Sequence, residues 1–194
     1  MSCPLGVSKV NKRYERAVAK YFTAASYNPH IIRSERMIGM EIERKYRVRM
    51  RPEHLEMYSV WHMTQGYICT EPVIRVRSIR DDKQELYVLT VKGNGLVERE
   101  EFELTLTKEQ YERLCQKVDG YVIEKKRYRI PLGGDLVAEL DEFLGRLQGL
   151  WLVEVEFKSR EAMAKFTPPQ WFGEDVSDDG TFQNSRLSRM EGYC

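Results

Sequence analysis

The sequence lacks a long apolar run and carries almost no net charge, and each absence excludes a class of partner. No apolar stretch approaches the ~20 residues of a membrane-spanning helix. The N-terminus lacks the basic-then-apolar pattern of a signal peptide. The formal net charge is only +1, so no overall field attracts nucleic acid or an anionic surface. We therefore expect a cytoplasmic protein with no membrane partner and no nucleic-acid partner.

The sequence also lacks paired cysteines. Cys3, Cys69, Cys115 and Cys194 are dispersed without a CxxC pair. This spacing argues against a zinc site and fits a reducing compartment. At 194 residues the chain is long enough for one domain with a sizeable core.

Charged residues are present at every second position in several short segments. Glu41-Ile42-Glu43-Arg44-Lys45 is the first, and Arg75-Val76-Arg77 and Glu154-Val155-Glu156 follow the same rule. Residues i and i+2 of a strand share a face and lie about 6.6 Å apart, at a rise of ~3.3 Å per residue. The alternation therefore predicts strands with one strongly charged face, suited to metal ions and to an anion.

Eight segments after Met40 have the pattern of strands. They are residues 40–50, 64–69, 73–80, 85–92, 97–105, 122–131, 135–143 and 151–158. Several connections are short, and Gly93-Asn94-Gly95 contains the Asn-Gly pair typical of a hairpin. Hairpins join antiparallel neighbours, so we expect an antiparallel sheet.

Helices are expected at few places. We predict one at residues 52–61, one after the capping box Thr107-Lys108-Glu109-Gln110 with Gly120 as its stop, and one from the Ser159 cap to Phe166. Residues 9–25 have an apolar stripe at helical spacing. We expect residues 1–39 to be an N-terminal appendage, helical by this pattern, and residues 40–194 to be one domain. The stripe must pack against something, and a homodimer contact is one option.

Eight antiparallel strands are enough to close into a barrel that encloses a small ligand. We predict a mainly β (α+β) fold, an eight-stranded antiparallel closed β-barrel tunnel with peripheral helices. Its lumen would hold Glu41, Glu43, Lys45, Arg75, Arg77, Lys92, Arg99, Glu101, Glu103, Lys125, Arg127, Glu139, Asp141, Glu154 and Glu156. The alternative is an ordinary sheet whose charged face lies in water. Repeated pairs of like charge favour the barrel, because solvent-facing strands usually mix signs.

An ordered set of motifs resembles the CYTH domain of the triphosphate tunnel metalloenzymes. Glu41-Ile42-Glu43-Arg44-Lys45 is similar to the family's ExExK signature. The segments that follow in the family's order are Gln65-Gly66-Tyr67, Ile74-Arg75-Val76-Arg77, Leu89-Thr90-Val91-Lys92-Gly93, Arg99 with Glu101-Phe102-Glu103, Ile123-Glu124-Lys125 with Arg127-Tyr128, Glu154-Val155-Glu156, Asp175-Val176-Ser177 and Phe182 to Leu187. The resemblance covers about residues 40–190. It departs at Phe182, where a Tyr is common.

The resemblance implies a tunnel that binds triphosphate with Mg²⁺ or Mn²⁺, in a two-metal site. By analogy, Glu41, Glu43 and Glu154 would hold one metal, and Glu103 and Glu156 would hold the second metal and its attacking water. Lys45, Arg75, Arg77, Lys92, Arg99, Lys125 and Arg127 would bind substrate. Glu41, Glu43, Lys45, Glu103 and Glu156 would be catalytic, with Glu101, Glu139 and Asp141 in support. Oxygen ligands suit these metals, and Lys and Arg suit phosphate.

Three functions are compatible with the resemblance. The first is hydrolysis of inorganic tripolyphosphate to pyrophosphate and phosphate, which we expect here. The second is a class IV-type adenylate cyclase that makes cyclic AMP from ATP, although no sequence mark of a nucleoside pocket is present. The third is a non-catalytic polyphosphate or nucleotide-binding module, which the paired carboxylates disfavour. The sequence leaves the choice among tripolyphosphate, ATP and thiamine triphosphate open.

Overall fold

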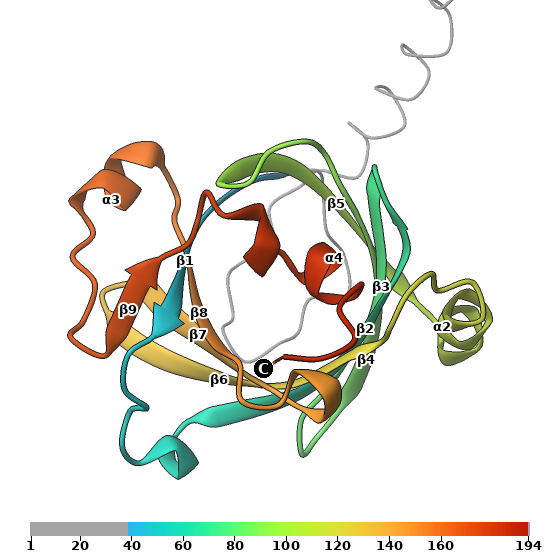
Figure 1. Ribbon diagram of the computed structural model, residues 1–194, viewed down its shortest axis with the longest axis horizontal. Helices are drawn as coiled ribbons and strands as arrows, with labels where there is room; N and C mark the ends of the chain where they lie inside the picture. The colour runs from blue at the N-terminus through green and yellow to red at the C-terminus, as the bar shows by residue number, and fades with distance from the viewer. Residues whose placement is uncertain (1–38, 194) are drawn as a thin grey trace, which may run out of the picture. The chain divides into compact units, whose positions relative to one another are not determined.

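A computed structural model describes residues 39–193, and these form a closed antiparallel barrel of eight strands (Figure 1). The strands are β1 (Gly39–Val48), β2 (Ser59–Thr70), β3 (Val73–Arg80), β4 (Glu85–Lys92), β5 (Glu98–Leu106), β6 (Ile123–Gly133), β7 (Leu136–Phe143) and β8 (Trp151–Glu156). Their order is β5-β4-β3-β2-β6-β7-β8-β1. Pairing of β1 with β5 then closes the ring, so the predicted fold class is confirmed.

The second strand is the main correction to the predicted elements. We predicted a helix at residues 52–61, but the structure has only a short 3-10 turn there, η1 (Leu55–Met57), and β2 already begins at Ser59. Trp61 pairs with Arg127 and Met63 with Lys125, so β2 follows β6 along this stretch. The prediction was wrong because cross-strand pairing, a long-range effect, outweighs the local helix signal.

Two helices begin at the predicted caps, and both lie outside the barrel (Figure 1). Helix α2 (Lys108–Cys115) begins with the full capping box of Thr107 and Gln110 and contacts β2, β3 and β4. It ends well before the expected stop at Gly120, because Gln116 already serves as its C-cap. Helix α3 (Arg160–Lys165) begins after Ser159, whose side chain accepts a hydrogen bond from the Ala162 amide, and it contacts β1.

A short ninth strand, β9 (Phe172–Asp175), was not predicted and pairs with β1 beside the barrel. It covers the outer core, a cluster of buried apolar side chains on the outward face of β1, β6, β7 and β8. The members are Ile42, Tyr46, Ile130, Ala138, Leu140, Val153, Val155, Phe157 and Phe172. Met163 of α3 and Phe166 pack against it. The outer face therefore supplies much of the apolar burial that holds the barrel together.

A second apolar cluster lies toward one end of the barrel. It consists of Tyr67, Ile123, Phe143, Leu147, Leu150, Leu152 and Leu187. It joins inward-facing strand residues to the turn η2 (Gly145–Leu147) and to α4 (Asn184–Leu187), which follows the turn η3 (Gly180–Phe182). Figure 1 shows α4 within the ring of strands in a view through the barrel. The C-terminal segment therefore packs across this end of the lumen.

The expected helix at residues 9–25 and the stripe on it lie outside the described residues. Within residues 39–193, no helix is both long and apolar enough to cross a membrane.

Candidate functional site: a lumen lined by paired charges

The charged side chains predicted for the lumen share one face of the strands. In the register, Lys45 lies opposite Glu154 and Lys92 lies opposite Glu101. Tyr46, the neighbour of Lys45, belongs instead to the outer core. Since successive side chains alternate between faces, the charged face points into the barrel. The structure thus brings the predicted residues together in one enclosed space.

Glu41 lies between two cations. Its carboxylate accepts hydrogen bonds from Nζ of Lys92 at 2.8 Å and from Nε of Arg99 at 2.9 Å. Burial alone would raise the pKa of Glu41, but the two cations outweigh it and lower that pKa to about 2. Glu41 is therefore ionised at neutral pH.

Glu43 has weaker cationic partners and anionic neighbours. Its Oε1 is 3.4 Å from Nη2 of Arg99 and 3.8 Å from Nζ of Lys45. Burial and the nearby Glu154 carboxylate raise the pKa of Glu43. Its backbone also lies directly opposite Glu156 in the β1–β8 register. An additional cation here would relieve the repulsion between these carboxylates.

Glu154 contacts cations from two different strands, β1 and β6. Its carboxylate is 3.0 Å from Nζ of Lys45 and 2.6 Å from Nη2 of Arg127. Burial opposes ionisation, yet these cations hold the pKa of Glu154 well below its usual value. Lys45 is 2% exposed, and its pKa is raised because Glu154 and Glu43 outweigh the effect of burial.

The most deeply buried ion pairs lie between β6 and β7. Asp141 and Lys125 have side chains that are each 1% exposed, with Nζ 2.5 Å from Oδ2. Arg127 donates to both oxygens of Asp141, each at 2.6 Å, and also contacts Glu139. Burial and the Arg127 cation together lower the pKa of Lys125 to about 8. Asp141 and Glu139 thus hold Arg127 in place.

A further group of charges lies on β3 and β5. Nη2 of Arg77 is 3.2 Å from Oε1 of Glu103, and Nη2 of Arg75 donates to Thr90 at 2.9 Å. Burial and the adjacent Arg75 cation lower the pKa of Arg77 to about 10. Burial raises the pKa of Glu101 to about 7. Burial in the lumen therefore disfavours the charged forms of Arg77 and Glu101.

Glu156 is placed differently from the other predicted site residues. It is exposed, whereas the rest of the set is buried or half-buried. Its register position opposite Glu43 puts it on the lumen-facing side of β8. Glu156 therefore lies where the charged lumen opens to solvent.

The residues fit a divalent metal by chemistry, although their present geometry is not a ready-made site. Among residues 39–193, no three His, Cys, Asp or Glu side chains converge as a metal-binding group. The lumen carboxylates instead contact Lys and Arg. Carboxylate oxygens are the donors that Mg²⁺ and Mn²⁺ prefer, and the crowding of Glu43 and Glu154 favours a cation. The donor set therefore fits such a metal.

Two lumen residues were missed as site candidates. Gln65 and Thr90 are each 0% exposed and lie among the charges, opposite Arg77 and Arg75 respectively. The sequence held a signal for Gln65, because Gln65 and Tyr67 share a strand face in the segment Gln65-Gly66-Tyr67, which resembles the family. The alternation of charge, however, predicts roles only for charged side chains.

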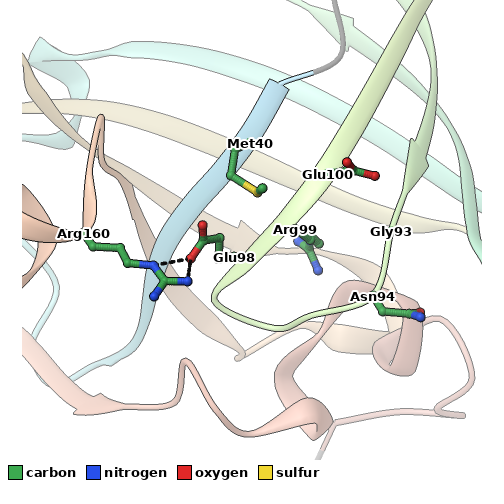
Figure 2. Close-up of a pocket in the computed structure, with 7 residues that line it drawn as sticks. All are labelled: Met40, Gly93, Asn94, Glu98, Arg99, Glu100 and Arg160. Atoms are coloured by element: carbon green, nitrogen blue, oxygen red, sulfur yellow. Dashed lines mark hydrogen bonds and ion pairs between the residues drawn. The ribbon is translucent and has the colours of Figure 1, made fainter.

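A separate hollow of about 440 Å³ lies at the seam between β1 and β5 (Figure 2). Its lining residues are Met40, Gly93, Asn94, Glu98, Arg99, Glu100 and Arg160. Nε of Arg160 donates to Glu98 at 2.6 Å across it. Met40, Glu98 and Glu100 have the outward parity, and the hollow shares only Arg99 with the lumen set. The candidate site is therefore the lumen and not this hollow.

Comparison with known proteins gives relatives over most of the chain. The chain is 38% identical over 148 residues to an inorganic triphosphatase from Nitrosomonas europaea, covering 76% of this chain and 96% of that protein. It is 35% identical over 157 residues to an inorganic triphosphatase from Acetivibrio thermocellus, covering 77% and 94%. A crystal structure of an inorganic triphosphatase matches with a TM-score of 0.57 at 34% identity, covering 79% and 97%. No protein-family model matches the chain.

Proposed function

Because this chain belongs to the inorganic triphosphatase family, we propose that it hydrolyses inorganic tripolyphosphate to pyrophosphate and phosphate inside its charged barrel. The same relatives confirm the resemblance to the triphosphate tunnel metalloenzymes. The observation that carries the proposal is the enclosed lumen, in which Lys and Arg side chains from several strands face one another and pair with carboxylates.

The charge balance of the lumen supports a metal–triphosphate complex as the substrate. Cations and carboxylates of the lumen set are nearly equal in number. A free triphosphate would therefore leave several negative charges uncompensated in a buried space, which is costly. Divalent cations bound with it would restore the balance. We accordingly propose dependence on Mg²⁺ or Mn²⁺ at two positions.

Exchange of partners is the proposed binding step. In the protein alone, Lys92 pairs with Glu41, Lys45 with Glu154 and Arg77 with Glu103. Phosphate oxygens would replace the carboxylates as partners of these cations, and Arg would bind two phosphate oxygens through its planar fork. The released carboxylates would then be free to bind metal.

The roles of single residues follow from the exchange. Glu41, Glu43 and Glu154 would hold one metal, and Glu103 and Glu156 would hold the other. When bound, such metals lower the pKa of water and offset charge on the phosphates. Lys45, Arg75, Arg77, Lys92, Arg99, Lys125 and Arg127 would hold the phosphates in line for attack and stabilise the charge that develops on them.

The deciding experiment compares kcat/KM for tripolyphosphate, ATP and thiamine triphosphate with Mg²⁺ or Mn²⁺, with products separated. We expect tripolyphosphate to have the highest value and to yield pyrophosphate and phosphate. Excess chelator should stop the reaction, and activity that persists in chelator would remove metal from the proposal. A higher kcat/KM for ATP, with cyclic AMP as product, would establish a cyclase instead.

Localisation and assembly are secondary proposals. We propose a cytoplasmic protein, because Cys69 and Cys115 are free thiols in the structure and free thiols persist in reducing compartments. We also propose that the substrate is its main partner, without nucleic acid. A homodimer remains a prediction, which size-exclusion chromatography with light scattering would test.

A further inference from the structure

Gln65 is a lumen residue whose hydrogen bonds are only half made. It lies on β2 and is 0% exposed. Its Nε2 donates to the Tyr67 hydroxyl at 3.1 Å. Its Oε1 is buried and has no hydrogen-bond partner among the described residues. A buried acceptor without a partner destabilises a protein, so its presence in the lumen requires an explanation.

Two donors without partners in the described part of the chain belong to β3, the strand that pairs with β2 beside Gln65. Gln65 is opposite Arg77 and Tyr67 is opposite Arg75 in the β2–β3 register. The Nε atoms of both arginines are buried and likewise have no partner among the described residues. One buried acceptor and two buried donors thus belong to residues at neighbouring register positions of β2 and β3, and each lacks a partner among the described residues. In this state Arg77 is engaged elsewhere, through Nη2 and Glu103 at 3.2 Å.

We propose that Gln65 is a positioning residue that orients Arg77 on the substrate. When phosphate and metal draw Arg77 away from Glu103, Nε of Arg77 turns toward β2 and donates to Oε1 of Gln65. Tyr67 holds the Gln65 amide in the required orientation through the existing hydrogen bond. The inference rests on the proposed function, because it needs a phosphate group to compete with Glu103 for Arg77.

Direct binding of phosphate by Gln65 is disfavoured by the same geometry. The unpaired atom of Gln65 is a carbonyl oxygen, which accepts hydrogen bonds and repels phosphate oxygens. The amide nitrogen, which could donate to phosphate, donates to the Tyr67 hydroxyl instead. Gln65 therefore acts through Arg77, whose fork of donors gains a fixed orientation from a second contact.

The first test replaces Gln65 by Met, which keeps the volume and removes the acceptor. We expect Gln65→Met to lower kcat/KM for tripolyphosphate about tenfold, the scale of one hydrogen bond to a charged group. The melting temperature of the ligand-free protein should stay unchanged or rise, because an unpaired polar atom is lost. The matched control is Met63→Leu, another buried lumen-facing position of β2 without a polar group, which should leave both values near wild type.

A double-mutant cycle with Arg77→Lys tests the route of the effect. Lysine lacks the Nε donor, so Gln65→Met should cost little more in that background. Tyr67→Phe, which keeps the ring and frees the Gln65 amide, should give a smaller loss that disappears in Gln65→Met. Tyr67→Phe also tests the proposal if Gln65→Met does not fold. Equal losses from Gln65→Met with and without Arg77→Lys would overturn the proposal.

Calorimetry of tripolyphosphate binding separates this inference from the proposed function, because it needs no turnover. An inactive wild-type protein that still binds tripolyphosphate would refute hydrolysis, and the affinity of Gln65→Met would still decide the role of Gln65. If wild type and Gln65→Met bind tripolyphosphate equally and turn it over equally, Gln65 is not a positioning residue.

Discussion

Glu41 and Glu43 are two residues apart on one strand face, yet their surroundings shift their pKa values in opposite directions. Lys92 and Arg99 outweigh burial and lower the pKa of Glu41 to about 2. Burial and Glu154 raise the pKa of Glu43. Ionised Glu43 is thus the less well compensated of the two, which makes it the carboxylate that gains most from a bound cation.

Glu43→Gln tests this at a single side chain. The amide is nearly isosteric but lacks the negative charge of a metal ligand, so turnover with Mg²⁺ or Mn²⁺ should fall about 100-fold or more. The melting temperature should fall little, because burial already disfavours the charged form of Glu43. Glu100→Gln, on the outward face of β5, is the matched control. Near-normal turnover by folded Glu43→Gln would contradict the assigned role.

Lys125 gives a prediction for pH. Its pKa of about 8 in the folded protein lies below its ordinary 10.5. Between these values the unfolded chain binds a proton that the folded protein lacks, so this group makes the free energy of unfolding rise with pH. Lys125→Met should remove that rise between about pH 8 and 10.5. Urea unfolding at several pH values measures it, with the outward-facing Lys126→Met as control; parallel curves for wild type and Lys125→Met would refute it.

The β4–β5 hairpin brings β5 to the seam of the barrel, where β5 pairs with β1. Only four register pairs join β1 to β5, and the amide of Glu43 adds a hydrogen bond to the Val97 carbonyl at 3.0 Å. Gly95 in this hairpin has a φ of 126°, and a Cβ there would lie 2.2 Å from the Glu98 carbonyl oxygen. The turn thus depends on a conformation that favours glycine.

Gly95→Ala should therefore lower the free energy of unfolding by about 1–3 kcal/mol, because the turn must distort or shift the start of β5. Gly180→Ala is the control, since a Cβ at that position meets no atom within 4 Å, and its effect should stay within about 0.5 kcal/mol. Chemical denaturation of both variants measures the difference. Equal stability of Gly95→Ala and wild type would show that the hairpin relaxes freely.

At the scale of the whole molecule, the eight strands of residues 39–193 form the lumen. Every charged residue proposed to bind substrate or metal lies on the eight strands, and the ring closes within that range. Stability is shared between the outer core, the apolar cluster at one end and the ion pairs of the lumen. We therefore propose that the functional domain begins near residue 40.

A protein that starts at Met40 tests that boundary. We expect it to fold and to keep kcat/KM for tripolyphosphate within a few-fold of the full chain, because its strands contain the whole proposed site. Its elution volume, compared with that of the full chain, would show whether residues 1–39 support a dimer. A folded but inactive truncated protein would mean that the appendage contributes to the site.

Much of this fold and of the charged face could be predicted from the sequence. Charge and apolar residues alternate with period 2, and that local pattern fixes both the strand and the face of each side chain. Glu41, Arg75 and Glu154 were placed on one face in this way. The caps at Thr107 and Ser159 likewise predicted where two helices begin, because capping is a contact within a few residues.

Tertiary structure alone decided which charges pair and where the strands continue. The pairing of Arg127 with Asp141 and Glu154 depends on registers between three strands. The extension of β2 to Ser59, the addition of β9 and the packing of α4 across one end also depend on distant partners. Local sequence fixes the direction of a side chain, whereas its partner across the barrel is set by closure of the whole ring.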